Sequence, residues 1–163
     1  MKKNIWEKAG MSNTSLEDQQ VYDNKSRLYL KVKSTYIKSP KTDLSIIYPA
    51  GGVQSTAKDL LKFGEAVLNH QLIDSTSLNM MINATDELAS AKGDDPYGFG
   101  WAVYNDPKNG KIIQHGGNQP GASAFFAIYL DHKIVSVVLS NSFGTRQNAF
   151  NLSRDIASLA LIE

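Results

Sequence analysis

The spacing of hydrophobic and polar residues changes twice along the chain, near residues 48 and 96. Residues 1 to about 47 are mostly polar, and their weak periodicity predicts only a short helix over residues 4–9 and a strand over residues 28–32. From residue 49 to about residue 83, apolar residues recur at helical spacing. Beyond Pro96 the alternation typical of strands takes over. We therefore expect a helical and irregular region, 1–95, followed by a β-rich region, 96–163.

The β-rich region predicts an antiparallel meander of about four strands. The expected strands are residues 97–104, 111–115, 122–130 and 133–140. The turn at 106–110 contains Gly110, which tolerates a positive φ. Residues 146–161 predict an amphipathic helix that starts at Thr145 and buries one apolar face, formed by Ala149, Leu152, Ile156, Leu159 and Ala160. A helix laid across such a sheet is an α+β fold.

Composition narrows the classes of function. The 163 residues suit one domain, and a net charge of +1 gives no electrostatic reason to expect a nucleic-acid partner. The absence of cysteine excludes disulfides and a thiol nucleophile. No apolar run approaches the roughly 18 residues of a transmembrane segment, and the first residues lack an apolar signal core. The compartment stays undetermined.

Ser55 and Lys58 form a Ser-x-x-Lys pattern, the nucleophile motif of penicillin-recognising hydrolases. Such a lysine acts as a base only where desolvation lowers its pKa. The helical spacing puts Lys58 on a polar face with Lys62, Glu65 and Asn69, opposite a stripe expected to be buried: Ala57, Leu60, Leu61, Gly64, Val67 and Leu68. Ser55 or Thr56 also suits the cap of a helix that starts here. We interpret this motif as a helix start.

Two further motifs contain residue types used in catalysis. Tyr22-Asp23-Asn24 matches Tyr-x-Asn, but its polar surroundings favour a turn. His115 follows a β-branched run and precedes Gly116 and Gly117, which would let a ligand approach the end of a strand. From spacing alone this segment is equally a binding edge or a glycine-rich turn with a surface histidine. A metal site is disfavoured because the three histidines (70, 115 and 132) lie far apart and lack a carboxylate motif.

Four stretches, taken in order, resemble the C-terminal portion of the β-lactamase-related serine hydrolases. They are residues 9–14 (AGMSNT), 49–63 (PAGGVQSTAKDLLKF), 97–101 (YGFGW), and 115–121 (HGGNQPG) with 137–141 (VVLSN). This family includes class C β-lactamases, D-alanyl-D-alanine carboxypeptidases and esterase-like enzymes. The resemblance implies an incomplete β-lactamase/transpeptidase-like fold and no cofactor.

The order of the motifs implies where the nucleophile lies. In the family, Ser-x-x-Lys and then Tyr-x-Asn precede the Gly-Met segment, which here is Gly10-Met11. Ser55 and Tyr22 follow that segment, so neither occupies the family's catalytic position. We expect the nucleophile-bearing N-terminal half to be outside these residues. The single domain would then be represented by its C-terminal part, 1–163, inactive without that half.

The resemblance also implies roles for the segment at residue 115. His115 takes the lysine position of the Lys-Thr-Gly motif, Gly117 is the motif's terminal glycine, and the backbone N–H of Asn118 is one oxyanion-hole donor. Gly116, Gly117 and Asn118 would align the substrate along the strand. The expected catalytic residues are therefore His115, Gly117 and Asn118. The imidazole of His115 could change charge near neutral pH, unlike a lysine there. By resemblance, histidine in place of lysine favours the peptidase- or esterase-like members of the family over a specialised β-lactamase.

Two functions stay open at this point. The first is the C-terminal segment of an acyl hydrolase that acts on a small-molecule or peptide-like acyl substrate. The second is a non-catalytic remnant or binding module with a hydrolase-like sheet. Because the family's sheet has two further strands from the N-terminal half, we expect an exposed strand edge and apolar surface, hence self-association or dependence on that half.

Overall fold

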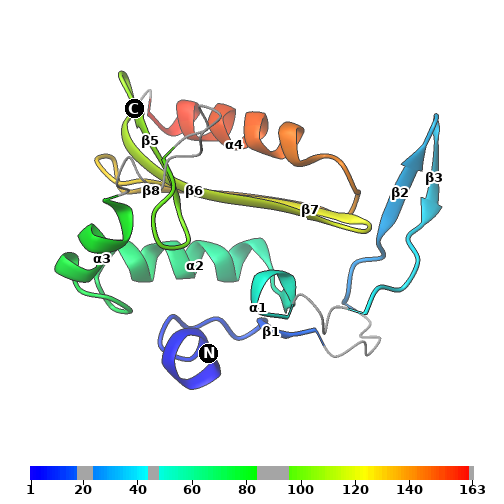
Figure 1. Ribbon diagram of the computed structural model, residues 1–163, viewed down its shortest axis with the longest axis horizontal. Coiled ribbons are helices and arrows are strands. Elements are labelled where there is room, and N and C mark those ends of the chain that lie inside the picture. Colours follow the sequence, from blue (N-terminus) through cyan, green and yellow to red (C-terminus); the bar gives the residue numbers. More distant parts are fainter. Residues whose placement is uncertain (18–23, 44–47, 84–95, 162–163) are drawn as a thin grey trace.

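A four-stranded antiparallel sheet forms the centre of the structure, a computed structural model that describes residues 1–17, 24–43, 48–83 and 96–161 (Figure 1). The strands lie in the order β5-β6-β7-β8, so each pairs with its neighbour in sequence. Their bounds are Ala102–Asp106, Gly110–Gln119, Ala122–Tyr129 and Ile134–Ser140. This confirms the predicted meander and the α+β class, and Gly110 has the expected positive φ of 71°.

Two of the predicted strand boundaries are wrong. The strand expected over 97–104 begins only at Ala102, because a tight turn precedes it: Gly98 N donates to Trp101 O at 2.7 Å, and Gly100 has φ 83°. The strand expected to end at His115 continues to Gln119, since both glycines after His115 pair with β7. His115 therefore lies within β6 and not at its end.

Strand β6 is longer than β5, so part of β6 has no neighbouring strand on the β5 side. β5 pairs with β6 only from Gly110 to Gln114, whereas β7 pairs with it from Ile112 to Gln119. On the β5 side, no described residue makes a backbone hydrogen bond to residues 115–119. We call this segment, 115–119, the β6 edge, because it is paired with β7 but unpaired on its β5 side among the described residues.

Helices cover both faces of the sheet (Figure 1). Helix α2 (Ala57–Leu68) packs on one face and α4 (Arg146–Ala160) on the other. The core on the α2 side also includes α3 (Ser75–Ile82), and its buried members are Val67, Leu78, Ile82, Trp101, Val103, Ile113 and Ile128. The core on the α4 side consists of Ile112, Phe125, Ala127, Tyr129, Ala149 and Ala157.

Helix α2 starts as the sequence indicates. The N-cap is Thr56, whose hydroxyl accepts a hydrogen bond from Asp59 N. Gly64 faces β8 so closely that a Cβ there would lie 2.5 Å from Val135. The expected stripe is only partly correct, because Ala57 and Leu61 are exposed while the charged Asp59 is fully buried.

Helix α4 buries a different face from the one predicted. Ala149, Ser153 and Ala157 lie against the sheet, and Ser153 Oγ donates to Ser136 Oγ of β8 at 2.9 Å. Small side chains at i, i+4 and i+8 let the helix approach closely. The larger members of the expected apolar face are exposed: Leu152, Ile156 and Leu159. Thr145 precedes the helix without capping it, since its hydroxyl donates to Ser142 O.

The first part of the chain is less regular. It comprises a π-helical turn (Lys2–Trp6), β1 (Ser15–Leu16) paired with β4 (Val53–Gln54), the hairpin β2–β3 (Tyr29–Val32 and Thr35–Lys38) and the short helix α1 (Tyr48–Gly51). The hairpin projects from the body of the molecule (Figure 1). Among the described residues, no helix is both long enough and apolar enough to span a bilayer.

Candidate functional site

The β6 edge presents its residues to opposite faces of the sheet, because strand side chains alternate. A Cβ on Gly116 would lie 2.8 Å from the Phe125 ring and 3.1 Å from Arg146 Nε, on the α4 side. A Cβ on Gly117 would meet no atom of the described residues within 4 Å, so these residues leave the space on the other face open. His115 and Gly117 thus share one unobstructed face, whereas Gly116 has a packing reason to be glycine.

His115 is held by Tyr97. Its Nε2 lies 2.9 Å from the Tyr97 hydroxyl, and the two rings meet edge to face with their centroids 6.0 Å apart. Partial burial of the imidazole and, secondly, the positive charge of Arg146 lower the pKa of His115 below its ordinary value. The neutral imidazole is therefore favoured at neutral pH.

Tyr97 itself is fixed by the turn that precedes β5. A Cβ on Gly98 would lie only 2.0 Å from the carbonyl oxygen of Met81, so the backbone passes close to α3. Phe99 N donates to the same carbonyl at 2.9 Å. The phenol is thus attached to a segment with little freedom to move.

Sequence reasoning did not find the Tyr97–His115 pair. Continuing the β5–β6 register, in which Ala102 faces Gln114, would place Tyr97 opposite Gln119. The turn at 98–101 bends the chain so that Tyr97 meets His115 instead. The glycines on both sides of Phe99 are the only local signal of that turn.

Asn118 uses its side chain on the α4 side of the sheet. Its Oδ1 lies 2.6 Å from the buried Ser123 Oγ, which also accepts a hydrogen bond from Thr145 N. This contact joins the β6 edge to the start of α4. The contact does not involve the backbone N–H of Asn118, which is the group expected to donate to the oxyanion.

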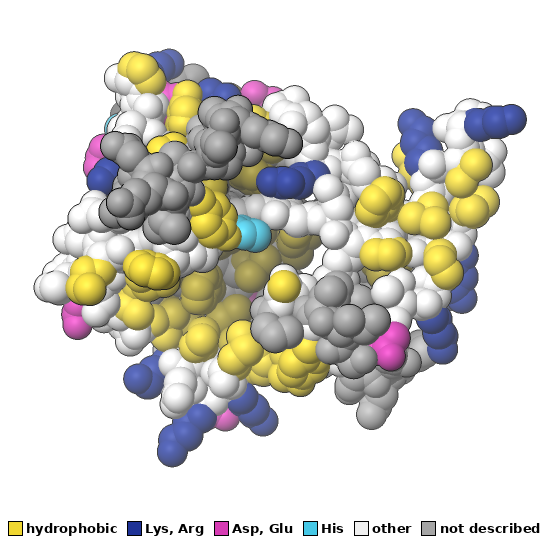
Figure 2. All heavy atoms as spheres, in the orientation of Figure 1, with side chains coloured by type: hydrophobic (Ala, Val, Ile, Leu, Met, Phe, Trp, Pro, Cys, Tyr) yellow, Lys and Arg dark blue, Asp and Glu magenta, His cyan; other side chains and the backbone are white. Residues whose placement is uncertain are grey.

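The far end of the β6 edge is tied to the loop that carried the family resemblance. The side-chain amide of Gln119 donates to the carbonyl oxygen of Gly51, at the end of α1. The face drawn in Figure 2 has a hollow lined by hydrophobic side chains, with a histidine at its rim.

Ser55 and Lys58 do not form a catalytic pair. Ser55 Oγ lies 2.7 Å from the hydroxyl of Thr14, and Lys58 is exposed to solvent. The prediction of a helix start with a solvated Lys58 is confirmed. Tyr22, the other candidate, lies outside the described residues.

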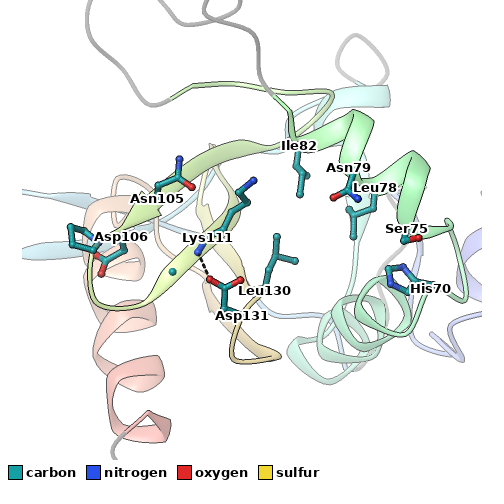
Figure 3. A pocket seen from close by; sticks show the side chains of 12 residues that line it. His70, Ser75, Leu78, Asn79, Ile82, Asn105, Asp106, Lys111, Leu130 and Asp131 are labelled. Atoms are coloured by element: carbon teal, nitrogen blue, oxygen red, sulfur yellow. Dashed lines mark hydrogen bonds between the residues drawn. The ribbon is translucent and has the colours of Figure 1, made fainter.

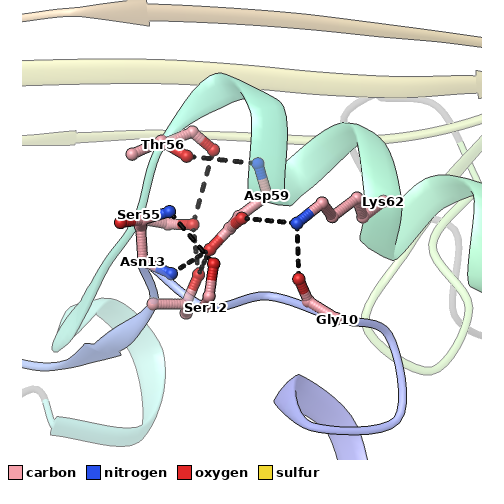
Figure 4. A network of polar contacts seen from close by, with 8 residues as sticks. Gly10, Ser12, Asn13, Ser55, Thr56, Asp59 and Lys62 are labelled. Carbon is pink, nitrogen blue, oxygen red and sulfur yellow. Dashed lines mark hydrogen bonds and ion pairs between the residues drawn. The ribbon is translucent and has the colours of Figure 1, made fainter.

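Ser55 belongs instead to a closed set of polar contacts around Asp59 (Figure 4). Asp59 Oδ2 accepts hydrogen bonds from Asn13 N at 2.6 Å and from the Thr14 hydroxyl at 2.9 Å. Lys62 Nζ lies 3.4 Å from Asp59 Oδ1 and donates to the carbonyl oxygen of Gly10. We call Thr14, Ser55, Asp59 and Lys62 the Asp59 cluster. It fastens residues 10–14 to α2.

Burial and hydrogen bonding act in opposite directions on Asp59. Burial is the largest single influence and raises its pKa, but hydrogen bonds from Asn13 and Thr14, together with Lys62, outweigh it. The net effect is a pKa below the ordinary aspartate value. The buried carboxylate is ionised because its partners satisfy it.

A cleft lies at the opposite end of β6 (Figure 3). It has a volume of about 680 Å³ between α3 and the β5–β6 turn, and its polar lining includes His70, Asn79, Lys111 and Asp131. Asp131 Oδ2 accepts a hydrogen bond from Lys111 N at 3.1 Å. None of the site residues predicted from the sequence lines this cleft. Within the described ranges, no three His, Asp or Glu side chains gather as a metal site would require.

The sequence profile described as Beta-lactamase matches residues 1–161, and the chain belongs to this family. Penicillin-binding protein 4* of Bacillus subtilis is 31% identical over 121 residues, which are 74% of this chain and 26% of that protein.

Solved structures agree on the fold. A penicillin binding protein from Bacillus halodurans superposes with a TM-score of 0.76 at 18% identity, over 95% of this chain and 48% of that one. A D-stereospecific amidohydrolase from Streptomyces sp. gives 0.73 at 20% identity, over 87% and 43%. The D-amino acid amidase from Ochrobactrum anthropi SV3 gives 0.69 at 19% identity, over 98% and 50%. The chain spans about a quarter of the curated relative and about half of these structures.

Proposed function

We propose that this chain supplies the substrate-aligning wall of an acyl hydrolase active site, with the β6 edge as that wall. The observation that supports this most directly is the unpaired segment 115–119, on which Gly117 leaves an unobstructed face. An extended acyl-amide backbone can add to such an edge as a further strand. The catalytic residues of this chain are then His115, Gly117 and Asn118, and Gly116 keeps the strand in register.

Each of these residues has a distinct task in the proposal. The backbone N–H of Asn118 donates to the oxyanion of the tetrahedral intermediate, a contact whose loss typically costs about a hundred- to a thousandfold in rate. His115 binds an acyl carbonyl or carboxylate of the substrate. Arg146 adds positive charge near the same strand, since its Nε borders the space beside Gly116. The positive charge of Arg146 and the N–H donors favour a substrate with a carboxylate or a polarised carbonyl.

The nucleophile comes from residues outside these 163. The Ser55 hydroxyl is engaged by that of Thr14, and Lys58 of its motif is exposed to solvent, which supports this assignment. The N-terminal half that carries the serine would cover two surfaces. One is the outer edge of β8, which pairs only with β7 among the described strands, and the other is the exposed apolar side of α4. Without that half, the same surfaces would promote self-association.

The names of the relatives and the presence of His115 support a proposal for the substrate class. Two structural neighbours are named for action on D-amino acid amides or for D-stereospecific amide hydrolysis. We infer hydrolysis of an amide or ester of peptidase- or esterase-like type, through an acyl-enzyme. The alternative is a binding module that holds an acyl peptide on the β6 edge without hydrolysing it. The internal hydrogen bonding of Ser55 favours that alternative for the chain by itself.

Labelling with a fluorescent penicillin and with a fluorophosphonate, followed by peptide mass spectrometry, tests the assignment. We expect no covalent adduct on the 163-residue chain, and the same result for the Ser55→Ala control. An adduct on Ser55 would overturn the proposal. The reading frame before codon 1 separates the two functions: Ser-x-x-Lys followed by Tyr-x-Asn supports the hydrolase, and their absence supports the binding module.

A further inference from the structure

The contact between Tyr97 and His115 bears on which nitrogen of the imidazole ring carries the proton. A neutral imidazole has one protonated and one unprotonated nitrogen, and the partner of one nitrogen decides the state of the other. Here Nε2 is the nitrogen in contact, 2.9 Å from the phenol oxygen. Nδ1 makes no hydrogen bond to any described residue, so it is the nitrogen left for a ligand.

The chemistry of the two groups sets the direction of this hydrogen bond. The phenol oxygen shares its lone pair with the ring, which makes the hydroxyl a better donor than acceptor. An unprotonated imidazole nitrogen is a strong acceptor. Donation from Tyr97 to Nε2 therefore leaves the ring proton on Nδ1. Partial burial and Arg146 keep the ring neutral and so preserve this distinction between the nitrogens.

We propose that Tyr97 is a positioning residue that fixes His115 as the Nδ1–H tautomer, so that His115 presents a hydrogen-bond donor at the β6 edge. Such a donor suits an acyl carbonyl or carboxylate oxygen and disfavours a ligand group that can only donate. The role assigned to the donor rests on the proposed function. The tautomer itself is a property of this chain that can be measured without any catalysis.

The rigidity of the Tyr97 segment supports this role. Phe99 N donates to the Met81 carbonyl, which also lies close against Gly98, and Tyr97 bridges to Ala102 at the start of β5. The edge-to-face contact orients the imidazole in addition to the hydrogen bond. A fixed donor on a strand loses less entropy on binding than a mobile side chain does.

The Tyr97→Phe variant removes the hydroxyl and keeps the ring. Because Tyr97 is 40% exposed, this change leaves no buried cavity, and the variant is expected to fold. Nitrogen-15 NMR of the imidazole groups distinguishes protonated from unprotonated ring nitrogens. In the unaltered protein above the pKa of His115, we expect a protonated Nδ1 and an unprotonated Nε2. In the variant, the proton should move predominantly to Nε2.

Two controls come from the same chain. The Tyr36→Phe change removes a hydroxyl from the exposed hairpin, and His115 should keep its tautomer there. His70 and His132 should give the same nitrogen signals in all three proteins. A protonated Nε2 in the unaltered protein, or a tautomer that does not respond to Tyr97→Phe, would overturn the proposal. Either result would leave the labelling test of the proposed function unaffected, so the two can fail separately.

Discussion

The Asp59 cluster and the β6 edge both contain residue types used in catalysis, yet they differ in what surrounds them. In the Asp59 cluster the carboxylate, both hydroxyls and the ammonium group contact one another or the backbone. On the β6 edge, Nδ1 of His115 has no described partner, and the space beside Gly117 is open. Catalytic residue types therefore do not locate a site by themselves. The groups left available for a ligand do.

The difference has a physical basis. A buried carboxylate without partners is costly, so its hydrogen bonds are needed for folding and are not free for a substrate. A strand edge lacks half of its backbone partners by construction and can offer them to a ligand. We accordingly assign a structural role to the Asp59 cluster and a binding role to the β6 edge.

The largest effect on stability is expected for Asp59→Ala. This change leaves Asn13 N and the Thr14 hydroxyl without their acceptor and Lys62 without its counter-charge. We predict a loss of about 3 kcal/mol in the free energy of unfolding, measured by urea denaturation. The matched control is Asp74→Ala, which removes the exposed N-cap of α3 and should cost about 1 kcal/mol. Equal losses in the two variants would contradict the structural role.

Acid should weaken the same cluster. The pKa of Asp59 is lower in the folded protein than its ordinary value, so its stabilising contribution is complete above that value. This contribution is lost as the pH falls through the folded pKa. Asp59→Asn should therefore remove part of the acid sensitivity of unfolding below about pH 4. The comparison requires urea midpoints of both proteins at several pH values.

The adjacent glycines Gly116 and Gly117 of β6 should differ in how strongly a substitution destabilises the protein. Gly116→Ala would press a methyl group on Phe125 and Arg146, and we predict a loss of about 1–3 kcal/mol in unfolding free energy. Gly117→Ala meets no described residue within 4 Å and should change stability by less than about 0.5 kcal/mol. Calorimetric binding of an acyl dipeptide should weaken in Gly117→Val. Undiminished binding by that variant would argue against the β6 edge as the binding site.

A smaller effect concerns the pKa of His115. Removal of the Arg146 charge in Arg146→Gln should raise this pKa, but it should stay below about 6.5 because burial is the larger cause. A lowered histidine pKa means that the unfolded chain binds the proton more readily. Stability should therefore fall as the pH drops from about 6.5 through the folded pKa. NMR titration of the ring protons measures the shift, and no change in Arg146→Gln would show that this charge does not reach His115.

The smallest effects are expected at the apparent nucleophile motif. Ser55→Ala loses the contact with Thr14 and should cost about 1 kcal/mol. Lys58→Ala should change stability by less than about 0.5 kcal/mol, because the side chain is exposed. A Ser–Lys dyad would require both changes to abolish any covalent labelling equally.

The sequence predicted the parts of the fold that depend on local signals. The Thr56 cap, the turn at Gly110, and strands β7 and β8 follow from neighbouring residues alone. It failed where a distant partner decides the outcome. The burial of Asp59 depends on Asn13 and Thr14, which lie more than 40 residues away in sequence.

The wrong predictions for the end of β6 and for the buried face of α4 also arise from contacts with distant residues. Glycines disfavour strands in isolation, but pairing with β7 keeps Gly116 and Gly117 in β6. On α4, a stripe of small residues and a stripe of large apolar residues have the same helical spacing. Only the close approach to Ser136 decides that the small residues face the sheet. His115 could be predicted from its motif. Tyr97 could not, because only the turn at residues 98–101 places it beside His115.

The most direct test of the central claim is to locate where an acyl substrate mimic binds. Titration of the 163-residue protein with an N-acetyl-D-alanyl amide, followed by backbone amide NMR, reports this residue by residue. We predict that the largest shift changes fall on residues 115–119, with no comparable changes in the Asp59 cluster. Changes centred on Ser55 and Asp59, or on the cleft between α3 and the β5–β6 turn, would contradict the assignment of the β6 edge.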